Sequence, residues 1–154
     1  MVVMRPSSFV RTLLSTGIAT VATTATAALF GKREVGSAAA PLNATSHILW
    51  GDEAAKHDEA DWRHTGVGVL LNAGAMLSWV YVQERYFPRP SGVWGAAASG
   101  VGVAALAYVT DYYLVPKRLT PGFEKRLSST ALFAIYASLA AALASGAALH
   151  TRSR

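Results

Sequence analysis

The sequence contains no cysteine and few charged residues. Among its 154 residues, Asp, Glu, Lys and Arg make up only 15%, against about 25% in a soluble globular domain. The absence of cysteine excludes disulfides, thiolate metal sites and thiol nucleophiles. The shortage of charge excludes an ordinary water-facing surface around the whole protein, and 52% of the residues are hydrophobic. Together these features favour a single domain that lies in a membrane.

The net charge is +5, which by itself would be compatible with nucleic-acid binding. The basic residues, however, stand at the edges of apolar segments and do not form one patch. This placement is typical of side chains that anchor helix ends at phospholipid headgroups. We therefore expect membrane lipids as partners and no nucleic acid.

Four segments without Asp, Glu, Lys or Arg are long enough to cross a hydrocarbon layer of about 30 Å. They predict membrane-spanning helices at about residues 12–31, 65–83, 91–110 and 128–149, with a polar loop at 32–64. The predicted fold is all-α: an integral membrane four-helix bundle with up-down-up-down connectivity and a long polar first loop. Within residues 35–51, the sequence indicates a loop with a short interfacial helix that ends near Trp50.

The first predicted span has an alternative interpretation as a processed leader. Arg5 and Arg11 precede it, and Ala25-Thr26-Ala27 resembles a cleavage site. Three spans would then remain. With four spans, six cations lie on one side of the membrane and eight on the other, so the positive-inside rule does not set the orientation.

Small and weakly polar residues predict how the helices pack. Ala96, Gly100 and Ala104 recur at a spacing of four, which lets helix backbones approach closely. This pattern also allows a protein partner or a homo-oligomer. A threonine stripe falls on one helix face at residues 12, 16, 20 and 24. It predicts hydroxyls bonded to their own helix or, alternatively, a polar path for a solute. Asn72 predicts a hydrogen bond between helices.

The polar first loop holds the residues with most chemical potential. If residues 52–64 form a helix, Glu53, His57, Asp61 and His64 share one face. With His47 they form a candidate site for a divalent metal, since imidazole and carboxylate groups ligate zinc, iron or manganese. Haem held between two histidines is a further alternative. The competing interpretation is a solvated amphipathic helix, in which case no cofactor is bound.

Three basic residues lie on the same predicted side as this loop: Arg118, Lys125 and Arg126. They are candidates to clamp the loop by pairing with its acids, or to hold a lipid phosphate between helix ends. No Asp, Glu, Lys or Arg falls inside a predicted span, which argues against proton coupling and voltage sensing. The chain also has no Walker sequence and no Gly-x-Ser-x-Gly motif, so no catalytic residue is predicted.

Several motifs carry a resemblance to a known group of proteins. They are the run Pro41-Leu-Asn-Ala-Thr-Ser-His-Ile-Leu-Trp-Gly51, then Arg63-His64-Thr65-Gly66, Asp111-Tyr112 and Arg118-Leu-Thr-Pro-Gly-Phe-Glu124. From about residue 35 onward the chain resembles small uncharacterised bacterial inner-membrane proteins, some of them loosely labelled symporter-like. The resemblance implies a multi-pass protein of the bacterial cytoplasmic membrane. It supplies no matched ion-coupling residue and no established activity.

These observations favour a non-enzymatic integral membrane protein. The expected role is that of an accessory or scaffold subunit, or a role in the envelope or its lipids. The first alternative is a metal- or haem-binding membrane protein that uses the histidine- and acid-rich loop. The second alternative is a small-solute permease with a threonine-lined path.

Overall fold

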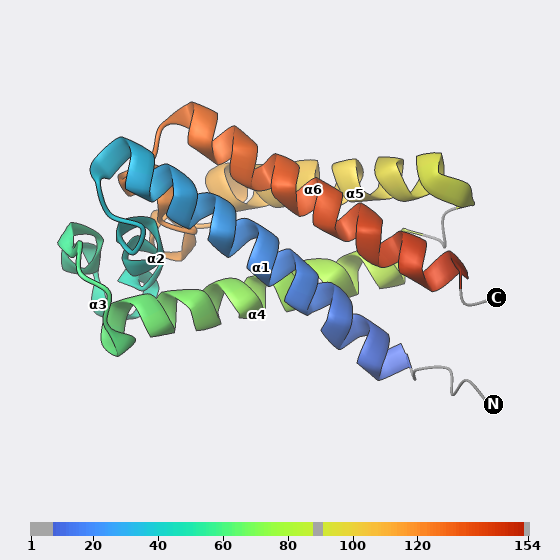
Figure 1. Ribbon diagram of the computed structural model, residues 1–154, viewed down its shortest axis with the longest axis horizontal. Helices are drawn as coiled ribbons and strands as arrows, with labels where there is room; N and C mark the ends of the chain where they lie inside the picture. Colours follow the sequence, from blue (N-terminus) through green and yellow to red (C-terminus); the bar gives the residue numbers. More distant parts are fainter. Residues whose placement is uncertain (1–7, 88–90, 153–154) are drawn as a thin grey trace.

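The computed structural model describes residues 8–87 and 91–152. Four long helices run side by side, and the start of α1 and the end of α6 lie at the same end of the bundle (Figure 1). They are α1 (Ser8–Val35), α4 (Val67–Tyr86), α5 (Gly92–Val109) and α6 (Ser129–Arg152). The described residues contain no strand. The predicted all-α bundle with up-down-up-down connectivity is therefore confirmed.

Short elements gather at the opposite end of the bundle (Figure 1). Residues 36–66 contain α2 (Ala40–Thr45), α3 (His47–Trp50), η1 (Asp52–Lys56) and η2 (Trp62–Gly66), and residues 115–128 contain η4 (Lys117–Leu119) and η5 (Phe123–Lys125). We call these two segments together the cap. The short helices do end at Trp50 as expected, but every residue of α2 is buried against the bundle.

Each of the four long helices is long and apolar enough to cross a membrane, and the continuous helical segments are Phe9–Val35, Trp62–Tyr86, Gly92–Leu114 and Ser129–Leu149. Two of them extend beyond the predicted spans because a π-helical turn prolongs the helix. The turn η2 precedes α4, and the turn η3 (Thr110–Leu114) follows α5. The second extension places Asp111 inside a spanning helix, so the expectation that no acidic residue lies within a span was wrong.

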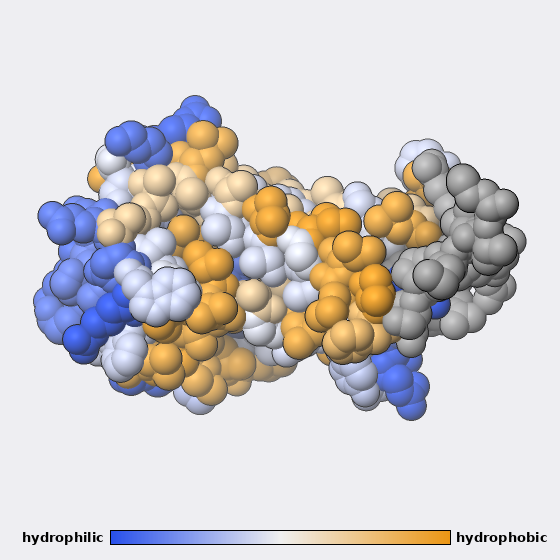
Figure 2. Space-filling model, turned by 60° about the horizontal axis from the view of Figure 1, so that its bottom comes forward, coloured by the Kyte–Doolittle hydropathy of each residue, from blue (hydrophilic) through white to orange (hydrophobic). Residues whose placement is uncertain are grey.

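The surface and the interior have the distribution expected of a membrane protein. Large apolar side chains face outward at mid-height, with Val101 60% exposed and Leu77 43% exposed. Figure 2 shows the apolar surface as a broad zone along the bundle, with the most hydrophilic residues towards its ends. Inside, one cluster around Val80, Val103 and Leu143 fills the middle. A second cluster around Leu42, Phe123 and Ile135 joins the bundle to the cap.

Small residues bring the helices together as the sequence predicted. Ala96, Gly100 and Ala104 are buried in α5, and α5 makes its most extensive contact with α6. A Cβ atom at Gly100 would lie 2.3 Å from the carbonyl oxygen of Ala140. Gly146 of α6 meets the side chain of Ser15 of α1 in the same way, at 2.7 Å. Gly100 therefore allows direct contact between the backbones of α5 and α6, and Gly146 leaves room for the side chain of Ser15.

The threonine stripe of α1 bonds only in part to its own helix. Thr12 donates to the carboxylate of Glu84 of α4 at 2.7 Å, and among the described residues the buried hydroxyl of Thr16 has no hydrogen-bond partner. Thr20 donates to the carbonyl of Thr16, and Thr23 donates to the carbonyl of Ala19. Asn72 of α4 donates its amide to the hydroxyls of Thr23, at 2.9 Å, and Thr24, at 3.2 Å. The predicted bond between helices at Asn72 is therefore present. Sequence analysis missed Gln83, which is buried and donates to Ser99 of α5 and to the carbonyl of Leu143 of α6.

Candidate functional site

Asn43, which is completely buried, holds the first cap segment together. Its amide donates to the backbone carbonyls of His57 and Glu59, each at 2.9 Å. Its own carbonyl accepts the hydroxyl of Thr65 at 2.5 Å. Gly68 makes this arrangement possible, because a Cβ atom there would lie 1.9 Å from the carbonyl oxygen of Leu42. Asn43 therefore fixes the path of the histidine-bearing segment over the start of α4.

Residues 52–64 do not form the continuous helix on which the shared face of Glu53, His57, Asp61 and His64 depended. The 3₁₀ turn η1 ends at Lys56, the chain is extended at His57 and Asp61, and η2 begins at Trp62. Glu53 pairs with Lys56 at 2.7 Å and not with a histidine. The helical spacing that suggested one shared face is thus interrupted, because Asn43 binds the backbone of residues 57 and 59 in an extended path.

The structure brings together three of the five candidate metal ligands. The rings of His57 and His64 stack with centroids 4.1 Å apart and planes inclined by 20°. Nδ1 of His64 lies 2.8 Å from a carboxylate oxygen of Asp61. Imidazole binds a metal in the plane of its ring, and two nearly parallel planes do not converge on one ion. Within the described residues, no group of three or more His, Asp or Glu side chains is placed to hold a metal.

His47 lies apart from the other candidate ligands and is buried under the second cap segment. Its Nδ1 is 2.8 Å from the carbonyl of Ala44, and its Nε2 is 3.3 Å from the carbonyl of Lys117. Gly122, at a φ of +85°, comes so close that a Cβ atom there would meet Nδ1 at 2.8 Å. His47 therefore joins α2 to residues 117–122. Metal binding by the loop stays a prediction. His57, His64 and Asp61 are the candidate ligands that lie together.

Three of the four basic residues of the second cap segment contact the first segment: Arg118, Lys125 and Arg126. Lys125 pairs with Asp52 at 2.9 Å, and Arg126 pairs with Asp58 at 2.5 Å. Arg126 also donates to the carbonyl of Ala55. Arg118 binds no acid; it donates to the carbonyls of Ile48 and Leu49. Through these contacts the basic residues clamp the two cap segments together.

Electrostatic contacts in the cap shift three pKa values in the direction that favours the charged form. The hydrogen bond and charge of Lys125 lower the pKa of Asp52. The hydrogen bonds from the ring and backbone of His64 lower the pKa of Asp61. The hydrogen bond and charge of Glu53 raise the pKa of Lys56. These groups are ionised near neutral pH, and their mutual attraction helps to order the cap.

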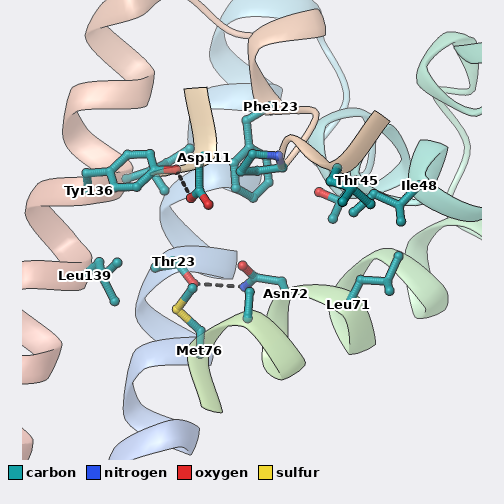
Figure 3. Close-up of a pocket in the computed structure, with 14 residues that line it drawn as sticks. Thr23, Thr45, Ile48, Leu71, Asn72, Met76, Asp111, Phe123, Tyr136 and Leu139 are labelled. Atoms are coloured by element: carbon teal, nitrogen blue, oxygen red, sulfur yellow. Dashed lines mark hydrogen bonds between the residues drawn. The ribbon is translucent and has the colours of Figure 1, made fainter. Parts of the chain in front are cut away.

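A small cavity of about 70 Å³ lies where α1, α4 and α6 meet the cap. Asp111, Asn72, Thr23, Thr45 and Tyr136 supply its polar lining. Figure 3 shows the Asp111 carboxylate pointing into the space above Thr23 and Asn72. The hydroxyl of Tyr136 donates to Asp111 at 2.5 Å. The sequence placed Asp111 at the edge of a span; only the π-helical turn η3 reveals that it faces the bundle.

A larger groove of about 780 Å³ lies between α5 and α6. Seven alanines line it: Ala97, Ala104, Ala105, Ala137, Ala140, Ala141 and Ala144. At the end near the cap, Tyr108, Tyr136 and Phe133 replace the alanines. The groove extends from Val109 to Ala97 along α5, which is about 18 Å at 1.5 Å per residue. It is a long apolar furrow with aromatic rings at the end nearest the cap.

The fold and these sites define the class of the protein. It is a multi-pass membrane protein built as a four-helix bundle, with a polar cap at one end. Comparison with protein-family models, with curated proteins and with solved structures finds no match to the chain.

Proposed function

We propose that this protein is a non-enzymatic membrane protein with a lipid-related role, in which the groove between α5 and α6 holds one acyl chain of a membrane lipid. The observation that carries the proposal is the alanine lining of this groove. Alanine side chains leave room where leucine or phenylalanine would fill the space, so the two helices expose a furrow and not a flat contact face.

The dimensions of the groove favour an acyl chain as its occupant. The furrow is about 18 Å long, and one leaflet of a bilayer contributes about 15 Å of hydrocarbon. It begins at the cap end, beside Tyr108 and Tyr136. A lipid of the leaflet nearest the cap therefore fits with its chain along the alanines. Because α5 and α6 are both membrane-spanning, lipid is the molecule present at this surface at highest concentration.

An accessory or scaffold role is consistent with lipid binding, since a bound lipid can fix the helix surface that a partner meets. The resemblance of the chain from about residue 35 onward to small bacterial inner-membrane proteins supports the placement of this protein in the cytoplasmic membrane of a bacterium. The permease alternative has less support from the geometry. Thr20 and Thr23 donate to carbonyls of their own helix, and apolar side chains around Val80 and Leu143 fill the middle of the bundle.

The test fills the groove and measures bound lipid. Ala137 lines the groove and is exposed, so Ala137→Phe places a ring in the furrow without disturbing the core. Ala25→Phe is the matched control, because Ala25 is an exposed alanine on α1 and lines neither the groove nor the cavity. Each full-length protein is purified in mild detergent, and its co-purifying lipid is quantified by mass spectrometry.

We expect about one lipid per chain to remain on the wild-type protein and on Ala25→Phe after extensive washing, and most of it to be lost from Ala137→Phe. Equal lipid retention by all three proteins would contradict the proposal. If Ala137→Phe keeps its lipid but no longer dimerises, or no longer co-purifies with a partner protein, the groove binds protein and not lipid.

A further inference from the structure

The cavity beside Asp111 has more hydrogen-bond acceptors than donors. Asn72 commits its amide hydrogens to Thr23 and Thr24. Thr23 donates to the carbonyl of Ala19, and Thr45 donates to the carbonyl of Pro41. Tyr136 gives its hydrogen to one oxygen of Asp111. The hydrogen-bond donors of these side chains are thus already used, and none is left to donate into the cavity.

The acceptors are left with open positions. In the described part of the chain, no hydrogen bond reaches the Oδ1 atom of Asn72 or the second carboxylate oxygen of Asp111. The orientation of the Asn72 amide follows from its neighbours, because Thr23 uses its own hydrogen on Ala19 and must accept from Asn72. Figure 3 shows the Asn72 oxygen turned towards Asp111. Two oxygens therefore face the same small space.

The carboxylate of Asp111 also has no ion-pair partner among the described residues. Asp111 lies in a spanning helix, where an ionised carboxylate without a partner is costly. The ion pairs among the described residues all lie in the cap, and none includes Asp111. Glu124 adds a second negative charge to its surroundings. The cavity thus combines negative charge, open oxygen acceptors and no cationic side chain, which is a setting that attracts a positive ion.

We infer that this cavity binds one alkali cation, Na⁺ or K⁺, between the carboxylate of Asp111 and the amide oxygen of Asn72. Hard cations prefer oxygen ligands, and a single lining carboxylate neutralises a single positive charge. A volume of about 70 Å³ accommodates the ion with about one water, each water occupying about 30 Å³. The cavity is a different site from the lipid groove, although Tyr136 forms part of the wall of both.

The route to the cavity lies on the cap side. Leu119, Pro121 and Phe123 close the cavity there, and all three belong to the second cap segment outside the spans. The opposite direction is filled by Met76 and Leu139, which belong to the central apolar cluster. The site is therefore a binding position at the end of the bundle and not part of a path across it.

The experiment measures thermal stability and cation binding of the full-length protein in detergent. Unfolding is followed at about pH 8, where a free carboxyl is ionised, in NaCl, in KCl and in N-methylglucamine chloride of equal ionic strength. Binding of radioactive sodium is measured in parallel by equilibrium dialysis on the wild-type protein. The variants are Asp111→Asn, which removes the charge with little change of shape, and Asn72→Leu, which removes the second oxygen.

We expect Na⁺ or K⁺ at saturation to raise the Tm of the wild-type protein by about 5 °C or more relative to N-methylglucamine. Dialysis should find about one Na⁺ per chain, displaced by K⁺ if K⁺ stabilises more. Asp111→Asn should be insensitive to the choice of cation, and Asn72→Leu should bind about tenfold more weakly or worse. If Asp111→Asn does not fold, the dialysis stoichiometry of the wild-type protein still decides.

Three results would overturn the inference. The first is a wild-type Tm that is the same in all three salts together with no bound sodium. The second is a Tm that depends on pH alone, which would show that Asp111 takes a proton instead. The third is cation stabilisation that survives Asp111→Asn. None of these results depends on whether the groove holds lipid, because Ala137→Phe does not alter the ligands of the cavity.

Discussion

The hydroxyl of Tyr136 donates to the carboxylate of Asp111 at 2.5 Å. This bond joins the first third of α6 to the turn η3 that follows α5, and it fixes the ring that separates the cavity from the groove. The ring also packs edge-on against Tyr108, with centroids 5.3 Å apart. One side chain thus contributes to the wall of both sites.

Tyr136→Phe removes this hydrogen bond and leaves the ring in place. We expect a loss of about 1.5–3 kcal/mol in the free energy of unfolding, because hydrogen bonds to charged groups contribute about this much. Tyr81→Phe serves as the control, since Tyr81 is exposed on α4. The measurement is reversible unfolding in mixed micelles. Equal stability of the two variants would show that the bond to Asp111 contributes little.

A pair of glycine substitutions tests the backbone contact between α5 and α6. Gly100→Ala places a methyl group 2.3 Å from the carbonyl oxygen of Ala140, so the helices must separate. We expect a destabilisation of about 1–3 kcal/mol, the usual cost of overpacking. Gly74→Ala in α4 meets no atom within 4 Å and should stabilise its helix by about 0.5–1 kcal/mol. Thermal unfolding of both variants provides the comparison, and a stable Gly100→Ala would contradict this packing.

The four spans could be predicted because their signal is local. A run of about twenty apolar residues between charges is visible in the sequence without knowledge of any partner. The small-residue face around Gly100 is periodic and was visible for the same reason. The ends of the spans were less predictable, because the π-helical turns η2 and η3 have no such local signature.

The sites depend on contacts between distant residues, which a single sequence does not reveal. The bond from Tyr136 to Asp111 joins residues 25 positions apart, and the path of residues 57–59 is set by Asn43. Helical spacing therefore suggested a face containing Glu53 and His57 that the extended segment does not form. Opposite charge on one predicted side did indicate the pairing of Lys125 and Arg126 with acids of the first loop, since both segments were expected at the same end of the bundle.

Metal binding by the first loop can be tested through His57 and His64. Elemental analysis of the purified wild-type protein is compared with His57→Ala and His64→Ala, together with an absorbance scan for haem. If the sequence prediction holds, one equivalent of a divalent metal is present and is lost in both variants. The stacked rings would then have to turn apart to share the ion. A wild-type protein without stoichiometric metal or haem would sink the prediction.

Acid should loosen the start of α4 through Asp61. Its pKa is lowered by the ring and backbone N–H of His64, so its contribution is fully present above the unfolded pKa of about 3.9. The contribution is lost as pH falls through the lower folded pKa. We expect the protection factors of residues 62–66, which compare the measured exchange with the intrinsic rate at each pH, to stay high at about pH 5 and to fall below about pH 4. Asp61→Asn should exchange faster already at neutral pH, whereas Glu59→Gln should match the wild-type protein.

The clamp between the two cap segments is tested by reversing one charge. Arg118 donates to the carbonyls of Ile48 and Leu49, so Arg118→Glu replaces two hydrogen bonds with repulsion between carboxylate and carbonyl oxygens. We expect trypsin to cleave after Lys56 several-fold faster, because segments held only by local contacts open more often. Lys117→Glu is the matched control: in the described structure the neighbouring Lys117 side chain makes no hydrogen bond or ion pair, and its reversal changes the net charge equally. Cleavage at the same rate in both variants would mean that Arg118 does not hold the loop, and that Lys125 and Arg126 carry the attachment.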